Sequence, residues 1–304
     1  MTTIHITLTG LFEVTTSGPD DTAPDGGLIE IRGVKPRQVL ALLALSAGQM
    51  VAKEQLAEGL WGANPPASWL ATVESYVCVL RRTLERATDG APVILTARGG
   101  YVLDPRSVDI DLDRSLESAR AALGTEDPGT AAQHVDAMLA AVRGTVLADE
   151  PYAAWAETAR TRLRAAVVAA TTHAARLALD AGDTTPARRL ADVALDWDPL
   201  CEPALRVAMR ARALDGRLNE ALRLYQVLAE TLSEEMGCDP DPATREVYAE
   251  VLRAGGGDAL SEPAEARVLI ELLRRSLAAS SGLRQLLSAD IEVLAREVRT
   301  GFAA

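Results

Sequence analysis

The chain has 304 residues, of which 48% are hydrophobic, 24% charged and 4% aromatic, and its formal net charge at pH 7 is −12. This length suffices for two domains, or three small ones, and the apolar fraction excludes a wholly disordered chain. The acidic balance argues against a protein that coats nucleic acid non-specifically, because that mode of binding requires a broad positive field.

Targeting and redox signals in the sequence indicate a cytoplasmic protein. No apolar run approaches the roughly 20 residues that a membrane-spanning helix needs, so we expect no membrane contact. The N-terminus has neither the basic nor the apolar segment of a secretory signal. Cys78, Cys201 and Cys238 are too widely spaced to suggest disulfides or a zinc site. For Cys78 we expect a semi-buried packing residue in preference to the alternative, a redox switch.

The first thirty residues are predicted to form strands. Ile4, Ile6 and Leu8 alternate with polar residues, which is the period of a half-buried strand. Residues 11–15 can return as a partner strand, and residues 28–31 follow a loop rich in Gly, Pro and Asp. A small three-stranded sheet is therefore expected before the first helix.

Three helices and a hairpin are predicted next. The helices are expected from residue 36 to about 48, at 53–60 and at 67–86. The third carries a single apolar stripe, which consists of Leu70, Val73, Val77, Leu80 and Leu84. Residues 93–103 have the pattern of a β-hairpin with Arg98 at its tip. A short helix, a turn, a longer helix and a basic hairpin together form the winged helix-turn-helix arrangement.

The helix over residues 67–86 has the side chains that a DNA-recognition helix needs. If its buried stripe is centred near Val77, the opposite face carries Ser68, Thr72, Ser75, Val79, Arg82 and Arg86. Arginine can bind guanine or phosphate, hydroxyls can reach base edges, and valine can contact a thymine methyl group. Arg81 lies nearer the buried stripe, which favours an orienting or phosphate contact. We expect Lys53 to meet a phosphate and Arg98 to meet a minor groove.

Charge is unevenly distributed along the chain. Residues 28–103 contain 8 basic and 6 acidic residues, a net charge of +2 within a chain of −12. Arginines also populate ordinary solvated helix faces, so the helix alone does not establish DNA binding. The surrounding winged-helix pattern and this local positive charge favour it, and the acidic total then indicates selective binding instead of coating.

From Asp109 onward the sequence predicts helices throughout. They are expected at residues 113–123, 129–142, 152–181, 186–195, 202–214, 218–236 and 241–252. An internal period of 34 residues, typical of tetratricopeptide repeats, relates two helix pairs. It matches Gly182 with Gly216, Ala187 with Ala221, Leu190 with Leu224, and Ala191 with Tyr225. Residues 264–277 and 283–299 are two further amphipathic helices, which could cap the repeats or mediate dimerisation.

The predicted fold is mainly α and divides into three parts. Residues 1–106 form a winged helix-turn-helix DNA-binding domain with a three-stranded sheet, three helices and a β-hairpin wing. Residues 107–254 form an all-α domain that is similar to tetratricopeptide repeats. Residues 255–304 comprise a glycine-containing linker and a C-terminal helical hairpin.

No catalytic, cofactor or metal site is evident in the sequence. His5, His134 and His173 are scattered without the spacing of metal ligands. No phosphate-binding P-loop motif occurs, and the glycines at 255–257 follow no strand, as a dinucleotide fingerprint would require. We therefore expect no enzymatic activity, no cofactor and no metal.

Motifs that extend over residues 1–254 carry a family resemblance. They are residues 56–62 (LAEGLWG), 65–66 (PP), 73–84 (VESYVCVLRRTL), 99–103 (GGYVL), 109–111 (DID), 144–147 (GTVL), Trp155, 221–225 (ALRLY), 234–237 (EEMG) and 239–240 (DP). In this order they resemble the SARP family, the Streptomyces antibiotic regulatory protein-type activators. That family joins an OmpR/PhoB-type winged helix to a bacterial transcriptional activation domain, abbreviated BTAD.

The resemblance implies a sequence-specific activator of transcription. Members bind direct repeats in promoter DNA as side-by-side protomers and recruit RNA polymerase holoenzyme, which implies a homodimer at least on DNA. Their targets imply control of antibiotic or other secondary-metabolite genes. By position, Arg81 and Arg82 match the paired arginines of the recognition helix, and residues 100–101 match the wing. Family members often have a polar or basic residue at the position of Val79, and serine at the position of Cys78. These two differences put the identity of the operator in doubt.

Two alternatives stay open at the level of the sequence. A ligand-responsive regulator would hold a small-molecule effector in the repeat groove or the terminal helices, and a thermal-shift screen would detect it. A protein-interaction adapter would use the repeats to bind a partner and would show no sequence-preferring retention of DNA.

Overall fold

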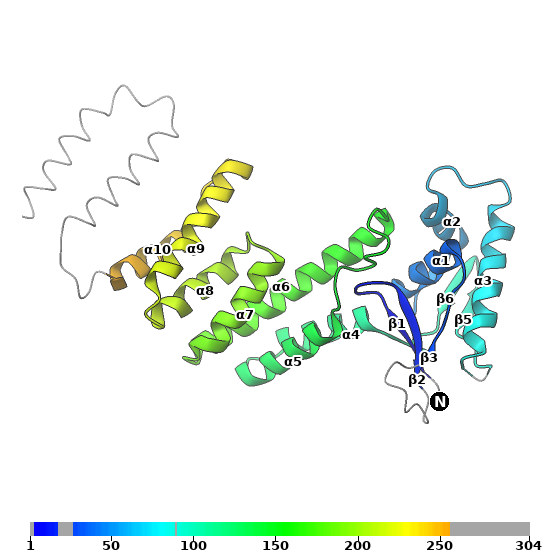
Figure 1. Cartoon of the computed structure of the whole chain (residues 1–304), viewed down its shortest axis with the longest axis horizontal. Coiled ribbons are helices and arrows are strands. Elements are labelled where there is room, and N and C mark those ends of the chain that lie inside the picture. Colours follow the sequence, from blue (N-terminus) through cyan, green and yellow to red (C-terminus); the bar gives the residue numbers. More distant parts are fainter. Residues whose placement is uncertain (1–2, 18–26, 89, 256–304) are drawn as a thin grey trace, which may run out of the picture. The chain divides into compact units, whose positions relative to one another are not determined.

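The structure, a computed structural model, describes residues 3–17, 27–88 and 90–255 (Figure 1). The strands are β1 (Thr3–Thr7), β2 (Glu13–Ser17), β3 (Gly27–Leu28), β4 (Met50–Ala52), β5 (Ile94–Ala97), β6 (Gly100–Leu103) and β7 (Val108–Ile110). The first helices are α1 (Val34–Ala44), α2 (Lys53–Trp61) and α3 (Trp69–Glu85). The predicted linker and helices beyond residue 255 lie outside the described residues.

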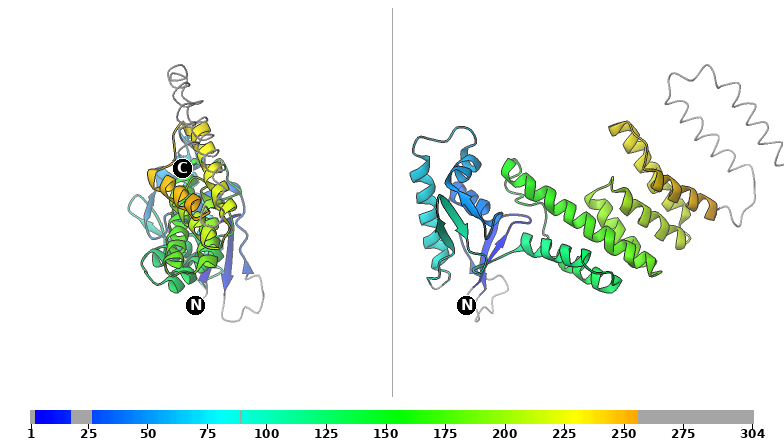
Figure 2. Two further views of the ribbon diagram at one scale, coloured as in Figure 1. Left: turned by 90° about the vertical axis from the view of Figure 1, so that its left-hand side faces the viewer. Right: turned by 180° about the vertical axis from the view of Figure 1, so that it is seen from behind.

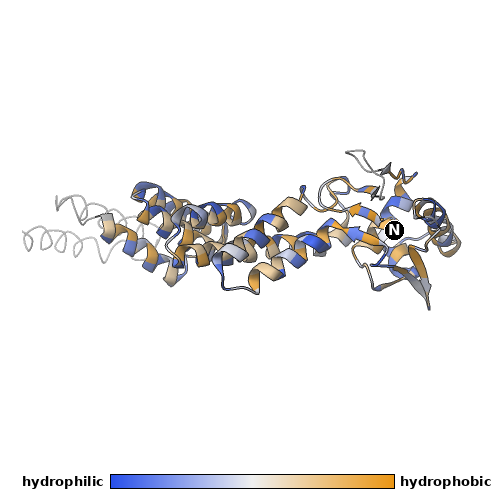
Figure 3. Ribbon diagram, turned by 90° about the horizontal axis from the view of Figure 1, so that it is seen from below, coloured by the Kyte–Doolittle hydropathy of each residue, from blue (hydrophilic) through white to orange (hydrophobic). Residues whose placement is uncertain are grey.

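Helices make up the rest of the described chain. They are α4 (Asp111–Leu123), α5 (Pro128–Ala141), the 3-10 helix η1 (Ala154–Ala156), α6 (Glu157–Asp180), α7 (Thr184–Trp197), α8 (Glu202–Leu214), α9 (Leu218–Thr231), the π-helix η2 (Leu232–Met236) and α10 (Pro242–Gly255). Along these helices hydrophobic and hydrophilic bands alternate in Figure 3, as expected where each helix buries one side. Among the described residues, no helix combines the length and the hydrophobicity that a membrane span requires.

The N-terminal sheet has four strands among the described residues, one more than expected. Their order is β3-β2-β1-β7, with β2 antiparallel and β7 parallel to β1. Ile4 pairs with Val108 and Ile6 with Ile110, so the expectation of helix from Asp109 onward is wrong for the first two residues. Three residues are too short to show the period of a strand, and β7 becomes recognisable only through its pairing with β1.

The predicted winged helix is confirmed, with one added strand. The wing is a three-stranded sheet of order β4-β6-β5, and the three residues of β4 were not expected. Val73, Val77, Leu80 and Leu84 of α3 are fully or almost fully buried. Leu70 was assigned to the same stripe, but it is 43% exposed and lies in the first turn of α3.

The helical domain contains the predicted 34-residue repeat as two helix pairs, α6 with α7 and α8 with α9. Gly182 and Gly216 follow the first helix of each pair with φ of +85° and +74°, the left-handed conformation that favours glycine. Ala187 and Ala221 are both completely buried, so the small residues of the repeat lie where helices approach closely.

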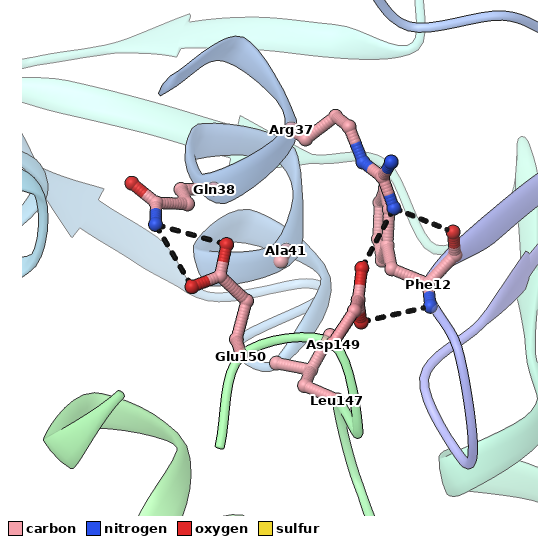
Figure 4. Close-up of a pocket in the computed structure, with 7 residues that line it drawn as sticks. All are labelled: Phe12, Arg37, Gln38, Ala41, Leu147, Asp149 and Glu150. Carbon is pink, nitrogen blue, oxygen red and sulfur yellow. Dashed lines mark hydrogen bonds and ion pairs between the residues drawn. The ribbon is translucent and has the colours of Figure 1, made fainter. Parts of the chain in front are cut away.

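A polar junction joins the winged helix to the segment between α5 and α6 (Figure 4). The Arg37 guanidinium donates to Asp149 Oδ2 at 2.7 Å and to the Phe12 carbonyl at 3.0 Å. The Gln38 amide donates to both carboxylate oxygens of Glu150, at 2.9 and 3.0 Å. The space that these side chains enclose is about 10 Å³, which holds no more than one water. The junction is therefore a structural contact and leaves no room for a ligand.

Candidate nucleic-acid interface

Helix α3 presents a polar and basic face on the side opposite its buried stripe. Ser75, Val79, Arg82 and Arg86 are all exposed, and 44% of Val79 is accessible to solvent. This arrangement follows from the 3.6-residue period, because each of these residues lies about half a turn from a member of the buried stripe. Four of the six residues predicted for this face therefore lie on one exposed strip of the helix.

The start of α3 differs from the predicted helix. The helix begins at Trp69, so Ser68 is its N-cap residue and lies outside the first turn. Thr72 is half-buried, and its hydroxyl donates to the Ser68 carbonyl oxygen at 2.9 Å. Pro65 and Pro66 precede this start and disfavour helix there. Ser68 and Thr72 therefore lie at the entry of the helix and not in the middle of its exposed face.

Arg81 connects α3 to the wing. Its Nε donates to the Ile94 carbonyl oxygen at 2.8 Å, and its Nη2 donates to Thr96 Oγ1 at 2.7 Å. The guanidinium also lies 5.6 Å from the centroid of the Tyr101 ring. In Figure 2 the view from behind shows α3 alongside the strands of the wing. Of the two roles considered for Arg81, this geometry favours orientation, since the contacts hold helix and wing in a fixed relation.

Lys53 lies at the start of α2 and is already paired. Its ammonium donates to Glu74 Oε1 of α3 at 2.6 Å and lies 5.7 Å from the centroid of the Tyr101 ring. The hydrogen bond to Glu74 raises the pKa of Lys53 above its usual value, so the ammonium stays charged at neutral pH. A phosphate contact by Lys53 would have to share or replace the contact with Glu74.

The turn of the wing places Arg98 in solvent. Gly99 has φ of +88°, a conformation that side chains rarely adopt. A Cβ on Gly100 would lie 2.2 Å from the carbonyl oxygen of Val51, so β4 and β6 can approach each other only with glycine at this position. The Lys53 amide donates to the Gly99 carbonyl at 3.1 Å, which connects α2 to the same turn.

Three arginines are available for a ligand at this surface. Within the part of the chain that the structure describes, Arg82, Arg86 and Arg98 have no hydrogen-bond or ion-pair partner. Cys78 is exposed beside them, so the expectation of a semi-buried packing residue is wrong. The side chain lies just beyond the edge of the buried stripe, where the helical period alone left its burial undecided.

Sequence reasoning missed what joins these elements. The Tyr101 ring lies near both cations, Lys53 and Arg81, and is itself only 5% exposed. Cation–π contacts of this kind depend on tertiary packing. The family resemblance placed Tyr101 in the wing, but no local sequence pattern indicated that its ring links α2, α3 and the wing. The pairing of Lys53 with Glu74 was equally invisible, because the two residues lie on different helices.

The described residues contain no cluster of three or more His, Cys, Asp or Glu side chains that could hold a metal ion. His5 Nδ1 lies 2.8 Å from Asp109 Oδ2, and His173 Nε2 lies 2.9 Å from the Thr125 carbonyl oxygen. These two histidines therefore connect elements of the fold. The chemistry offered by the described surface is the binding of an anionic polymer through α3 and the wing.

Two sequence families match successive parts of the chain. Residues 33–103 match the family described as "Transcriptional regulatory protein, C terminal", and residues 108–252 match "Bacterial transcriptional activator domain". The regulator RedD of Streptomyces coelicolor is 30% identical over 256 residues, which cover 80% of this chain and 71% of RedD. The chain belongs to the SARP family of transcriptional regulators.

Two further regulatory proteins extend the comparison. MoaR1 of Mycobacterium tuberculosis is 28% identical over 255 residues, which cover 82% of both chains. AfsR of Streptomyces griseus is 29% identical over 257 residues, and the match covers 83% of this chain but 25% of AfsR. The family supports transcription regulation, DNA binding and a BTAD as properties of this protein.

A solved structure has the same architecture. Mycobacterium tuberculosis EmbR, determined in complex with a low-affinity phosphopeptide, matches with a TM-score of 0.70 and 27% identity. The match covers 83% of this chain and 66% of the EmbR chain. The winged helix followed by a helical domain is therefore an arrangement already observed in a transcriptional regulator.

Proposed function

We propose that this SARP-type regulator is an activator that binds promoter DNA through the exposed face of α3 and the tip of the wing. The observation that carries the proposal is the set of unpaired arginines, Arg82, Arg86 and Arg98, on one recognition helix and its wing. The proposed DNA-binding residues are Lys53, Ser68, Thr72, Ser75, Val79, Arg81, Arg82, Arg86 and Arg98. Arg81 contributes by orienting α3 and the wing, and it can also donate to a phosphate.

The proposed mode of action follows the family. Protomers bind side by side on direct repeats and recruit RNA polymerase holoenzyme, and the regulated genes direct the synthesis of antibiotics or other secondary metabolites. The protein acts in the cytoplasm, where its DNA lies, and needs no catalytic step. The matches to residues 33–103 and 108–252 support a division into a DNA-binding domain at 1–106, an activation domain at 107–254 and a C-terminal part at 255–304.

DNase I footprinting on the promoter regions nearest the gene tests this function. We expect protection of two adjacent direct repeats, since two protomers bind side by side and each places one α3 in a major groove. Protection that extends uniformly along the fragment, or none at any protein concentration, would contradict sequence-specific binding.

A gel shift at fixed salt tests the residue assignment. Arg82→Ala and Arg86→Ala should each weaken binding to the protected promoter, by about 1–3 kcal/mol where the arginine contacts guanine. Arg164→Ala is the matched control, because Arg164 is an exposed arginine of α6 in the helical domain. Unchanged binding by both α3 variants would remove these residues from the interface.

A further inference from the structure

A groove on the helical domain has an apolar lining that is open to solvent. It is formed by α7, the turn after it, α8 and α9, and has a volume of about 240 Å³. Its lining consists of Leu195, Pro199, Leu205, Arg223, Leu224, Val227 and Leu228. Leu205 and Leu228 are buried at its base, whereas Val227 is 64% exposed. An apolar groove bordered by an aliphatic side chain can accept the apolar face of an amphipathic helix.

The internal repeat shows how the same positions are used one repeat earlier. A shift of 34 residues relates Arg189, Leu190, Val193 and Ala194 of α7 to Arg223, Leu224, Val227 and Leu228 of α9. In α7 the leucine is completely buried and the valine half-buried. In α9 the leucine is only half-buried and the valine is exposed. The apolar surface that the first copy buries therefore stays accessible in the second.

The arginines of the two copies differ in the same way. Arg189 of α7 lies 3.3 Å from Asp136 Oδ1 of α5, with which it forms an ion pair. Arg223 of α9 is exposed and has no ion-pair or hydrogen-bond partner among residues 3–17, 27–88 and 90–255. The position is thus suited to a carboxylate from a neighbouring helix, and in the second copy the described chain supplies none.

We propose that this groove is the surface through which the protein binds RNA polymerase holoenzyme. The occupant is a polymerase helix that places aliphatic side chains against Leu224 and Val227 and a carboxylate against Arg223. We infer an acidic side chain on the partner because Arg223 is positively charged and its counterpart Arg189 forms an ion pair with a carboxylate. This inference rests on the proposed function, because it names the contact by which the activator would recruit polymerase.

A transcription assay with purified holoenzyme and the footprinted promoter tests the groove. Full-length Arg223→Glu and Val227→Asp should each lower activation about tenfold or more, because a desolvated anchor at the centre of an interface contributes more than about 1.4 kcal/mol. Both variants should bind the promoter within about twofold of the wild-type affinity in a gel shift. Gln226→Glu is the matched control, since Gln226 is exposed on α9 and does not line the groove, and it should activate normally.

Photo-crosslinking identifies the occupant directly. A photoreactive phenylalanine at position 227 of the full-length protein should form an adduct with one holoenzyme subunit on the promoter, and Arg223→Glu should reduce it. The same group at position 226 should give little of this adduct. Adducts only within the chain, or only between two copies of it, would overturn the proposal.

The outcomes separate this inference from the function on which it rests. If the wild-type protein occupies the promoter but does not stimulate transcription, activation itself is wrong, and the polymerase groove is overturned with it. If the wild-type protein stimulates transcription and both groove variants do so equally, only the groove assignment fails. Variants that lose promoter binding while they keep a native circular dichroism spectrum would also overturn it, because the groove would then act on DNA affinity.

Discussion

At the scale of single residues, Asp111 makes the most concentrated set of buried contacts in the described chain. Only 4% of the residue is exposed, and its Oδ1 accepts hydrogen bonds from the backbone N–H groups of Leu8 and Leu112, both at 2.7 Å. Its Oδ2 accepts from the Thr9 N–H at 3.0 Å and from the Thr9 hydroxyl. A carboxylate with this many donors connects the end of β1 to the start of α4.

Asp111→Ala should lower the free energy of unfolding by about 3 kcal/mol, because several buried donors lose their acceptor at once. Urea denaturation followed by circular dichroism measures the change. Glu117→Ala on the same helix is the control, since Glu117 is exposed, and it should be nearly neutral. Equal stability of the two variants would show that the Asp111 contacts contribute little.

Arg81 and Arg82 are neighbours with different expected roles. Arg81→Ala should weaken both folding and DNA binding, because it removes the hydrogen bonds to Ile94 and Thr96 that hold the wing, at a cost of about 1–3 kcal/mol in stability. Arg82→Ala should weaken DNA binding and leave the thermal midpoint unchanged, because its side chain is exposed. Thermal unfolding and gel shifts on the two variants measure this split. Equal thermal midpoints would contradict the orienting role of Arg81.

At the scale of elements, the repeat predicts unequal effects at equivalent leucines. Leu190→Ala should lower the free energy of unfolding by about 2–5 kcal/mol, because Leu190 is completely buried. Leu224→Ala should cost clearly less, since Leu224 is half-buried beside the open groove. Chemical denaturation of both variants measures the difference, and losses of the same size would mean that the groove is closed in solution.

Most long elements could be predicted from the sequence, whereas the short ones could not. The stripe of Val73, Val77, Leu80 and Leu84 predicted α3 because a 17-residue helix repeats its period several times. β4 and β7 have three residues each, too few to show alternation. The exposed face of α3 followed from the same period. The contacts of Lys53 and Arg81 did not, because they join residues on different elements through Tyr101.

At the scale of the molecule, the winged helix is completed by residues that come after it in the chain. β7 pairs with β1, and the Leu147 and Ala148 amides donate to the carbonyls of Leu8 and Gly10, at 2.7 and 2.8 Å. Arg160 of α6 donates to the Glu150 carbonyl at 2.7 Å and to the Val146 carbonyl at 3.0 Å. The N-terminal sheet therefore depends on the helical domain for part of its hydrogen bonding.

A fragment of residues 1–106 should consequently be much less stable than the full chain, because it lacks β7, Asp111 and residues 145–148. Thermal unfolding by circular dichroism and amide dispersion in NMR spectra measure this. A fragment of residues 1–181 is the control, since it restores all three together with α6 and Arg160, and it should regain a cooperative transition. A well-dispersed 1–106 fragment with the thermal midpoint of the full chain would contradict the dependence.

The salt dependence of binding is the most direct test of the proposal that α3 binds DNA through its free arginines. Gel shifts on the footprinted promoter over a series of salt concentrations give the slope of the logarithm of the binding constant against the logarithm of the salt concentration. Arg82→Ala should reduce the magnitude of this slope by about one if Arg82 contacts a phosphate. Arg164→Ala removes the same charge from the helical domain and should leave the slope unchanged. Wild-type slope and affinity in Arg82→Ala, or equal losses in both variants, would contradict the proposal.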